Sequence, residues 1–186
     1  LCVLTFNLPT KIFAKELEAF YNVELGNINI GSLKWIINME GNNYNTSMFL
    51  NDKGLLSGLY SFSGEYLSEG KYLKGEFVSS RYKQFWKTKK KTKEIEILFD
   101  DMLVYSLVQK PKENENPRID YFKIKGLVDP LTSFLNILES STNNYKTIDG
   151  RRLYKMLLNF EKTEGDIVSK KIIITDYINI WTDHKK

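Results

Sequence analysis

The stretch that decides the fold runs from residue 94 to residue 108 and reads EIEILFDDMLVYSLV. Its first half alternates between acidic and apolar side chains, with one face formed by Ile95, Ile97 and Phe99. A period of two is typical of a half-buried β-strand. The pair Asp100–Asp101 predicts a turn, and residues 102–108 predict a returning strand. This stretch therefore indicates an antiparallel hairpin.

Alternating patterns of the same kind extend in both directions along the chain. They predict further strands over residues 17–25, 28–37, 44–50, 77–87, 151–160 and 167–181. One helix is expected from about residue 129 to residue 139, because Asp129 is a good N-cap and Pro130 fits the first helical position. The expected fold is mainly β, an antiparallel, strongly curved sheet or barrel of about eight to ten strands with one short helix.

Composition limits the chemistry. The chain of 186 residues fits one domain. Its net charge is +4, but acidic residues are interspersed among the basic ones, so the sequence predicts no nucleic-acid partner. The single cysteine is Cys2 and the single histidine is His184. These counts argue against a thiolate zinc site, a disulfide scaffold and a histidine-based hydrolase. We expect no catalytic residues, no metal and no cofactor.

The first fourteen residues resemble the end of a secretory signal peptide. An apolar run covers residues 1–6, and Ile12, Phe13 and Ala14 precede Lys15. We expect residues 1–14 to be a signal remnant and residues 15–186 to be one domain, exported to the periplasm of a Gram-negative bacterium. The alternative is an ordinary first strand with a turn at Pro9. The mature protein is expected to be soluble and at most peripheral to a membrane.

Charged clusters give the other candidate sites. Five lysines stand close together and form a candidate contact for an anionic surface: Lys87, Lys89, Lys90, Lys91 and Lys93. The alternative is a solvated hairpin tip that protects a sheet edge. Carboxylates occur in the pairs Glu16/Glu18, Glu94/Glu96 and Asp100/Asp101. Such pairs can hydrolyse glycosides, although alternation places Glu94 and Glu96 on a solvent face.

The dipeptide Asp149–Gly150 predicts a tight turn with a positive φ at the glycine. Arg152 follows it and is expected to share a strand face with Tyr154 and Met156. We interpret Asp149, Gly150 and Arg152, like Asp129 and Pro130 at the helix start, as structural residues.

Several of these stretches, taken in order, resemble the DUF3108 family of bacterial exported proteins. The resemblance covers roughly residues 17–160 and rests on five stretches: residues 20–31 (FYNVELGNINIG), 51–63, 68–70 (SEG), 129–133 (DPLTS) and 149–154 (DGRRLY). The family's Arg-Pro before the central strand is replaced here by residues 78–82, and its members continue with further strands, so the chain is expected to be truncated at its C-terminus. The family's function is unknown. The resemblance implies an exported antiparallel β protein.

Three functions remain open from the sequence. The first is a non-catalytic cell-envelope protein that binds a lipid, a lipoprotein or an envelope glycan, inside an apolar space with the lysines near its opening. The second is a structural protein-interaction module, and the third is a carboxylate-based envelope hydrolase. The residues expected to line the apolar space are Tyr21, Val23, Leu25, Trp35, Ile37, Ile95, Ile97, Phe99, Leu103 and Tyr105. The alternative is that the helix fills this space with Leu131, Phe134, Leu135 and Leu138 and leaves a packed core. The sequence leaves the oligomeric state open.

Overall fold

The computed structural model describes residues 15–25, 28–52, 61–139, 144–164 and 167–181. The predicted signal remnant, residues 1–14, lies outside them. The described elements, in chain order, are β1 Lys15–Leu25, β2 Ile28–Glu40, β3 Asn43–Asp52, β4 Phe62–Leu73, β5 Glu76–Thr88, β6 Thr92–Asp100, β7 Leu103–Lys110, the 3-10 turn η2 Tyr121–Lys123, β8 Leu127–Val128, α1 Pro130–Glu139, β9 Asn144–Ile148, β10 Arg152–Glu164 and β11 Ile167–Asn179.

The first seven strands form one antiparallel meander, in the spatial order β1 to β7. Each strand pairs with its neighbour in sequence, because short connections between alternating apolar strands favour hairpins. The mainly β class with one helix is confirmed. β1 and β7 are the two edges of this sheet and are not paired with each other, so the described strands form an open sheet and not a barrel.

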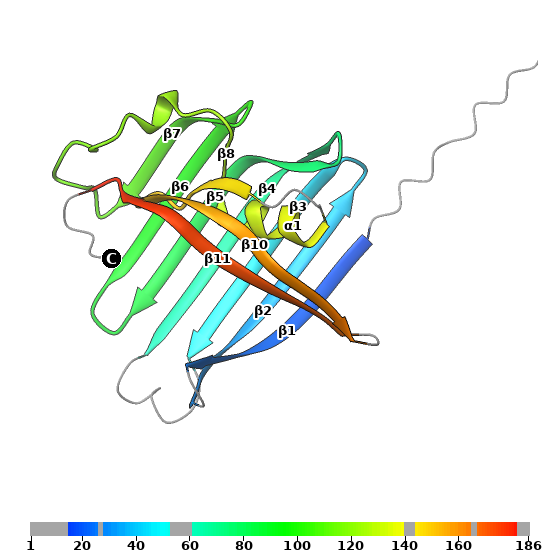
Figure 1. Ribbon diagram of the computed structural model, residues 1–186. Helices are drawn as coiled ribbons and strands as arrows, with labels where there is room; N and C mark the ends of the chain where they lie inside the picture. Colours follow the sequence, from blue (N-terminus) through cyan, green and yellow to red (C-terminus); the bar gives the residue numbers. More distant parts are fainter. Residues whose placement is uncertain (1–14, 26–27, 53–60, 140–143, 165–166, 182–186) are drawn as a thin grey trace, which may run out of the picture.

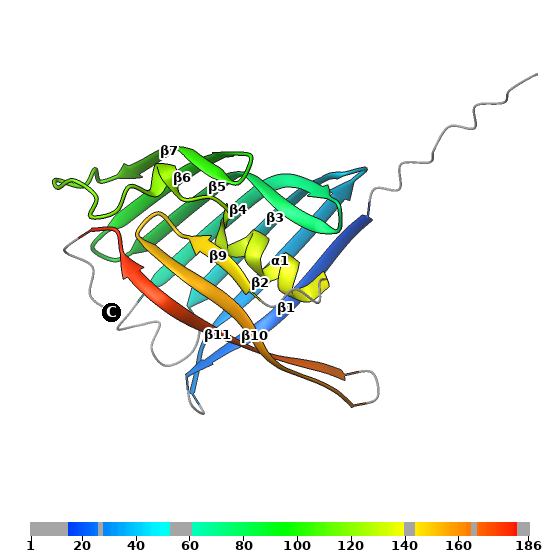
Figure 2. The ribbon, with the colours of Figure 1, turned by 45° about the horizontal axis from the view of Figure 1, so that its top comes forward.

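A second, smaller sheet has the order β11-β10-β9-β8. β8 and β9 run parallel, with α1 as the connection between them. Parallel strands require such a crossover, and the sequence did not predict this one. Figures 1 and 2 show α1 and the second sheet lying on one face of the seven-stranded sheet. We call this covered side the inner face.

The core fills the space between the inner face and the second layer. Ile95, Ile97 and Phe99 are buried there, as their alternation with acidic residues predicts. They pack in one cluster with residues of the second layer such as Leu131, Ile148, Leu153 and Trp181. Burial of these apolar side chains supplies the main stabilisation of the two-layer arrangement.

The turn between β6 and β7 comprises Asp101 and Met102, one residue later than predicted. The residues of β7 therefore point to the faces opposite to those expected. Asp101 and Met102 both have a positive φ, at 46° and 58°, and the pairing of β6 with β7 shifts between Leu98 and Phe99. Val104 is therefore buried, whereas Tyr105 is 59% exposed. The prediction that Leu103 and Tyr105 point into the core is wrong, because the turn pairs Leu103 with the exposed Asp100 and places Val104 opposite the buried Phe99.

The sequence pattern did not predict β4, which contains two glycines on its inner side. A Cβ on Gly64 would lie 2.9 Å from the Trp86 ring, and a Cβ on Gly70 would lie 2.0 Å from the Val78 carbonyl oxygen. These positions require glycine because neighbouring groups approach the backbone closely.

Candidate functional site

The turn between β9 and β10 presents two consecutive arginines. Oδ1 of Asp149 accepts hydrogen bonds from the backbone N–H groups of Arg151 and Arg152, both at 2.8 Å. Gly150 has a φ of +88°, so the predicted positive φ is confirmed. Trp181 Nε1 also donates to the Gly150 carbonyl at 3.1 Å. Burial raises the pKa of the Asp149 carboxyl, and the two backbone N–H groups oppose that rise.

A cleft of about 440 Å³ lies between this turn and the end of the β5–β6 hairpin. Alternate residues of β5 line it, because successive side chains of a strand point to opposite faces. Its lining residues are Tyr66, Gln84, Trp86, Thr88, Lys91, Lys93, Ile95, Arg151 and Arg152. The volume suits a small group or one end of a larger ligand.

The structure divides the predicted lysine cluster. Lys91 and Lys93 line the cleft. Lys87 is exposed and lies on the outer face, because it follows the inward-pointing Trp86. Lys89 and Lys90 are exposed in the turn of the hairpin. The five lysines therefore lie on a hairpin end, and two of them belong to the same site as the arginines.

The electrostatics of the cleft favour an anion. Four cationic side chains line it, and none of the described residues in its lining is acidic. The nearest paired carboxylates are Glu113, at 3.9 Å from Arg151, and Asp149, at 3.9 Å from Arg152. Both distances are at the outer limit of an ion pair, so each carboxylate neutralises its arginine only in part.

Two cleft residues also offer hydrogen-bond donors. The Arg152 side chain lines the cleft and is 35% exposed, although its Nε is buried without a hydrogen-bond partner among the described residues. Its guanidinium lies 5.4 Å from the centre of the Tyr177 ring, which holds its orientation. Burial, with the nearby charge of Asp149, raises the pKa of Tyr66 to about 12. The Tyr66 hydroxyl therefore stays protonated at neutral pH and can donate.

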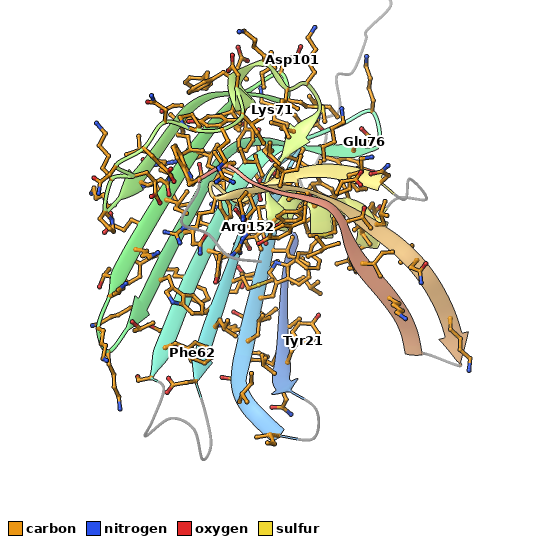
Figure 3. The ribbon with its side chains drawn as sticks, turned by 60° about the vertical axis from the view of Figure 1, so that its left-hand side comes forward. Tyr21, Phe62, Lys71, Glu76, Asp101 and Arg152 are labelled. Atoms are coloured by element: carbon orange, nitrogen blue, oxygen red, sulfur yellow. The ribbon has the colours of Figure 1, made fainter. Side chains whose placement is uncertain are left out.

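The cleft continues into an apolar row on the inner face. Pairing registers place six residues side by side across β6, β5, β4, β3, β2 and β1, namely Lys93, Trp86, Gly64, Leu50, Leu33 and Tyr21. We call this the cross-strand row. Trp86 stacks on Phe62 at 5.5 Å between ring centres. Tyr21 is 50% exposed, and Figure 3 shows Tyr21 and Phe62 on the part of the sheet that α1 does not cover.

The predicted helix start has a different role. Oδ1 of Asp129 accepts the backbone N–H groups of Leu131 and Thr132 at 2.9 and 3.0 Å, which are the contacts of an N-cap. Its Oδ2 accepts from the hydroxyls of Ser68 and Ser79, at 2.8 and 2.6 Å, and from that of Thr132. The carboxyl is fully buried, and this burial raises its pKa. Asp129 thus fixes α1 to β4 and β5, with Pro130 as the first helical residue.

The predicted carboxylate pairs do not converge on the cleft. Glu96 bonds Arg81 at 2.7 Å, and Glu94 bonds Lys110 at 3.1 Å, both on the outer face. The Arg81 hydrogen bond lowers the pKa of Glu96. Asp100 and Asp101 are exposed at the β6–β7 turn.

Comparisons with known proteins add no assignment. No family model, curated protein or solved structure matches the chain. Within the described residues, no group of three or more histidine, cysteine, aspartate or glutamate side chains could hold a metal ion. In the same residues, no helix has the length and apolar character needed to cross a bilayer.

Sequence reasoning found part of this site. It singled out Lys91, Lys93 and Arg152 but treated them as separate features, because residues 91–93 and 152 are far apart in the chain. It did not assign Trp86 or Tyr66 to a ligand. In the sequence, Lys93 precedes the predicted inward residue Ile95 by two positions, which indicates that Lys93 also points inward, but no such signal places it near Arg152.

Proposed function

We propose that the protein is a non-catalytic binding protein that holds the apolar chain of a lipid-like ligand along the cross-strand row. The observation that carries this proposal is the row itself, an apolar path across five strands that ends at a cationic cleft. Strands lie about 4.8 Å apart, so the path from Trp86 to Tyr21 is about 19 Å long. That is the length scale of a long acyl chain.

The geometry supports binding better than hydrolysis. The two buried carboxylates described above, Asp129 and Asp149, both accept backbone N–H groups and neither lines the cleft. A general acid or base must reach its substrate within hydrogen-bond distance. Together with the expected export signal, these features favour a role in the cell envelope, where lipids and acylated proteins are the available ligands.

A matched pair of variants tests the proposal. Phe20 and Tyr21 are exposed aromatic neighbours on β1, and they point to opposite faces of the sheet. Binding of monopalmitoylglycerol, whose sixteen-carbon chain is long enough to reach from Trp86 to Tyr21, should weaken about tenfold or more in Tyr21→Glu when measured by calorimetry, because a charge would be buried against the chain. Phe20→Glu should bind like the wild type. Absence of binding to the wild type, or equal loss in both variants, would contradict the proposal and leave an interaction module as the better account.

A further inference from the structure

We propose that the cleft between the β5–β6 hairpin and the β9–β10 turn is a binding site for a phosphate ester at the end of the bound chain. The inference rests on the proposed function, because the cleft and the apolar row share Trp86 and Lys93. It names the head group of the ligand, which the apolar row alone does not define.

The arrangement of the cations points to a phosphate. Lys91 and Lys93 approach from the hairpin, and Arg151 and Arg152 from the turn, so positive charge lines two opposite walls. A carboxylate carries a single negative charge. A phosphate monoester carries nearly two charges and three acceptor oxygens, which better match several donors on two walls.

The backbone of the turn holds the arginine wall in place. The Asp149 carboxylate accepts hydrogen bonds from the backbone N–H groups of Arg151 and Arg152, and Gly150 packs so closely on Ile95 of β6 that a Cβ would lie 2.5 Å from its side chain. The β9–β10 turn and β6, which carries Lys93, are therefore positioned relative to each other before any ligand binds. Such preorganisation lowers the entropic cost of binding.

The exposed part of Arg152 supports the same assignment. Its side chain lines the cleft and is 35% exposed, so its guanidinium N–H groups can donate to a phosphate oxygen there. The indole of Trp86 and the hydroxyl of Tyr66 lie in the same lining, where the ester and the first carbons of the chain would rest.

The test compares three ligands that differ by one feature at a time: lauroyl lysophosphatidate, monolauroylglycerol and glycerol 3-phosphate. We expect the wild type to bind lysophosphatidate about tenfold or more tightly than monolauroylglycerol at low salt, because charged hydrogen bonds add to chain burial. Added salt should reduce this preference. Equal affinities for the two lipids would overturn the phosphate site and leave the proposed function standing.

Two double variants with the same change in charge locate the effect. Lys91→Gln/Lys93→Gln alters the cleft, and Lys87→Gln/Lys90→Gln alters the same hairpin outside the cleft. We expect the cleft variant to lose the preference for lysophosphatidate while keeping its affinity for monolauroylglycerol, and the outer variant to keep both. An equal loss in the two variants would mean diffuse attraction to the hairpin and would overturn the site.

The third ligand separates the two proposals. Glycerol 3-phosphate should bind weakly, and its binding should also depend on Lys91 and Lys93. If glycerol 3-phosphate bound as tightly as lysophosphatidate, the phosphate site would be supported and the acyl-chain function would fail. If neither lipid nor glycerol 3-phosphate bound, both proposals would be wrong.

Discussion

The backbone of Gly150, in the β9–β10 turn, lies directly against the side chain of Ile95 on β6 of the seven-stranded sheet. A Cβ on Gly150 would fall 2.5 Å from Ile95 Cγ2, and the φ of Gly150 is +88°. This contact joins the arginine wall of the cleft to the strand that carries Lys93.

The contact predicts a large cost for Gly150→Ala. The positive φ and the steric overlap each disfavour a side chain, and together they should lower the free energy of unfolding by about 3 kcal/mol or more. Gly75→Ala is the matched control, because Gly75 has a φ of +87° and a Cβ added there would meet nothing within 4 Å. It should lose only about 1 kcal/mol. Equal losses in urea unfolding would show that the contact with Ile95 contributes nothing.

A second prediction concerns Asp129. Asp129→Ala removes the helix cap and the charged acceptor that the buried hydroxyls of Ser68 and Ser79 share. The expected loss is about 2–4 kcal/mol, which exceeds the effect of a cap alone. Asp120→Ala is the control, because Asp120 precedes η2 without a side-chain cap bond and its ion pair with Lys123 is exposed. A similar small loss in both variants would exclude a stabilising network around Asp129.

The pH dependence of stability gives a third prediction. Burial raises the pKa of Asp129 in the folded protein above its ordinary value. A group of this kind stabilises the fold while it is protonated, and that contribution is lost as the pH rises through the folded pKa. The wild type should therefore lose stability relative to Asp129→Asn as the pH is raised from about 3 towards 7. A relative gain by the wild type over this interval, measured in urea melts, would mean that the carboxyl has a lowered pKa.

Local features could be predicted from the sequence because they depend on neighbouring residues. The alternation around Ile97, the cap at Asp129 and the positive φ of Gly150 all follow from short-range geometry. Each of them needs only the period of a strand or the preference of one residue type.

Long-range features could not be predicted in this way. The parallel pairing of β8 with β9 depends on how α1 packs, and β4 contains Gly64 and Gly70 because aromatic and backbone groups from other strands approach them. The cleft likewise joins Lys91 and Lys93 to Arg151 and Arg152 across the two layers. No local pattern contains this information, because tertiary packing decides it.

A fourth prediction addresses the aromatic part of the cleft. Trp86 and Phe85 are consecutive on β5, and Trp86 lines the cleft whereas Phe85 lies on the outer face. Trp86→Ala should weaken binding of monolauroylglycerol about tenfold, because the ring contributes a large apolar contact. Phe85→Ala should leave binding unchanged. If calorimetry showed that Phe85→Ala weakens binding more than Trp86→Ala does, the ligand would bind on the outer face.

The most direct measurement is the response of the three indole N–H signals in a proton–nitrogen NMR spectrum during titration with lauroyl lysophosphatidate. Trp35 Nε1 is buried and bonded to Thr46 Oγ1 at 2.6 Å, and Trp181 Nε1 is buried and bonded to the Gly150 carbonyl at 3.1 Å. Trp86 lines the cleft at the start of the cross-strand row. With the signals assigned by single Trp→Phe variants, we predict the largest shift at Trp86, saturating with the ligand, and almost none at Trp35. A titration that leaves the Trp86 signal unmoved would contradict the central claim that this face of the sheet binds the lipid.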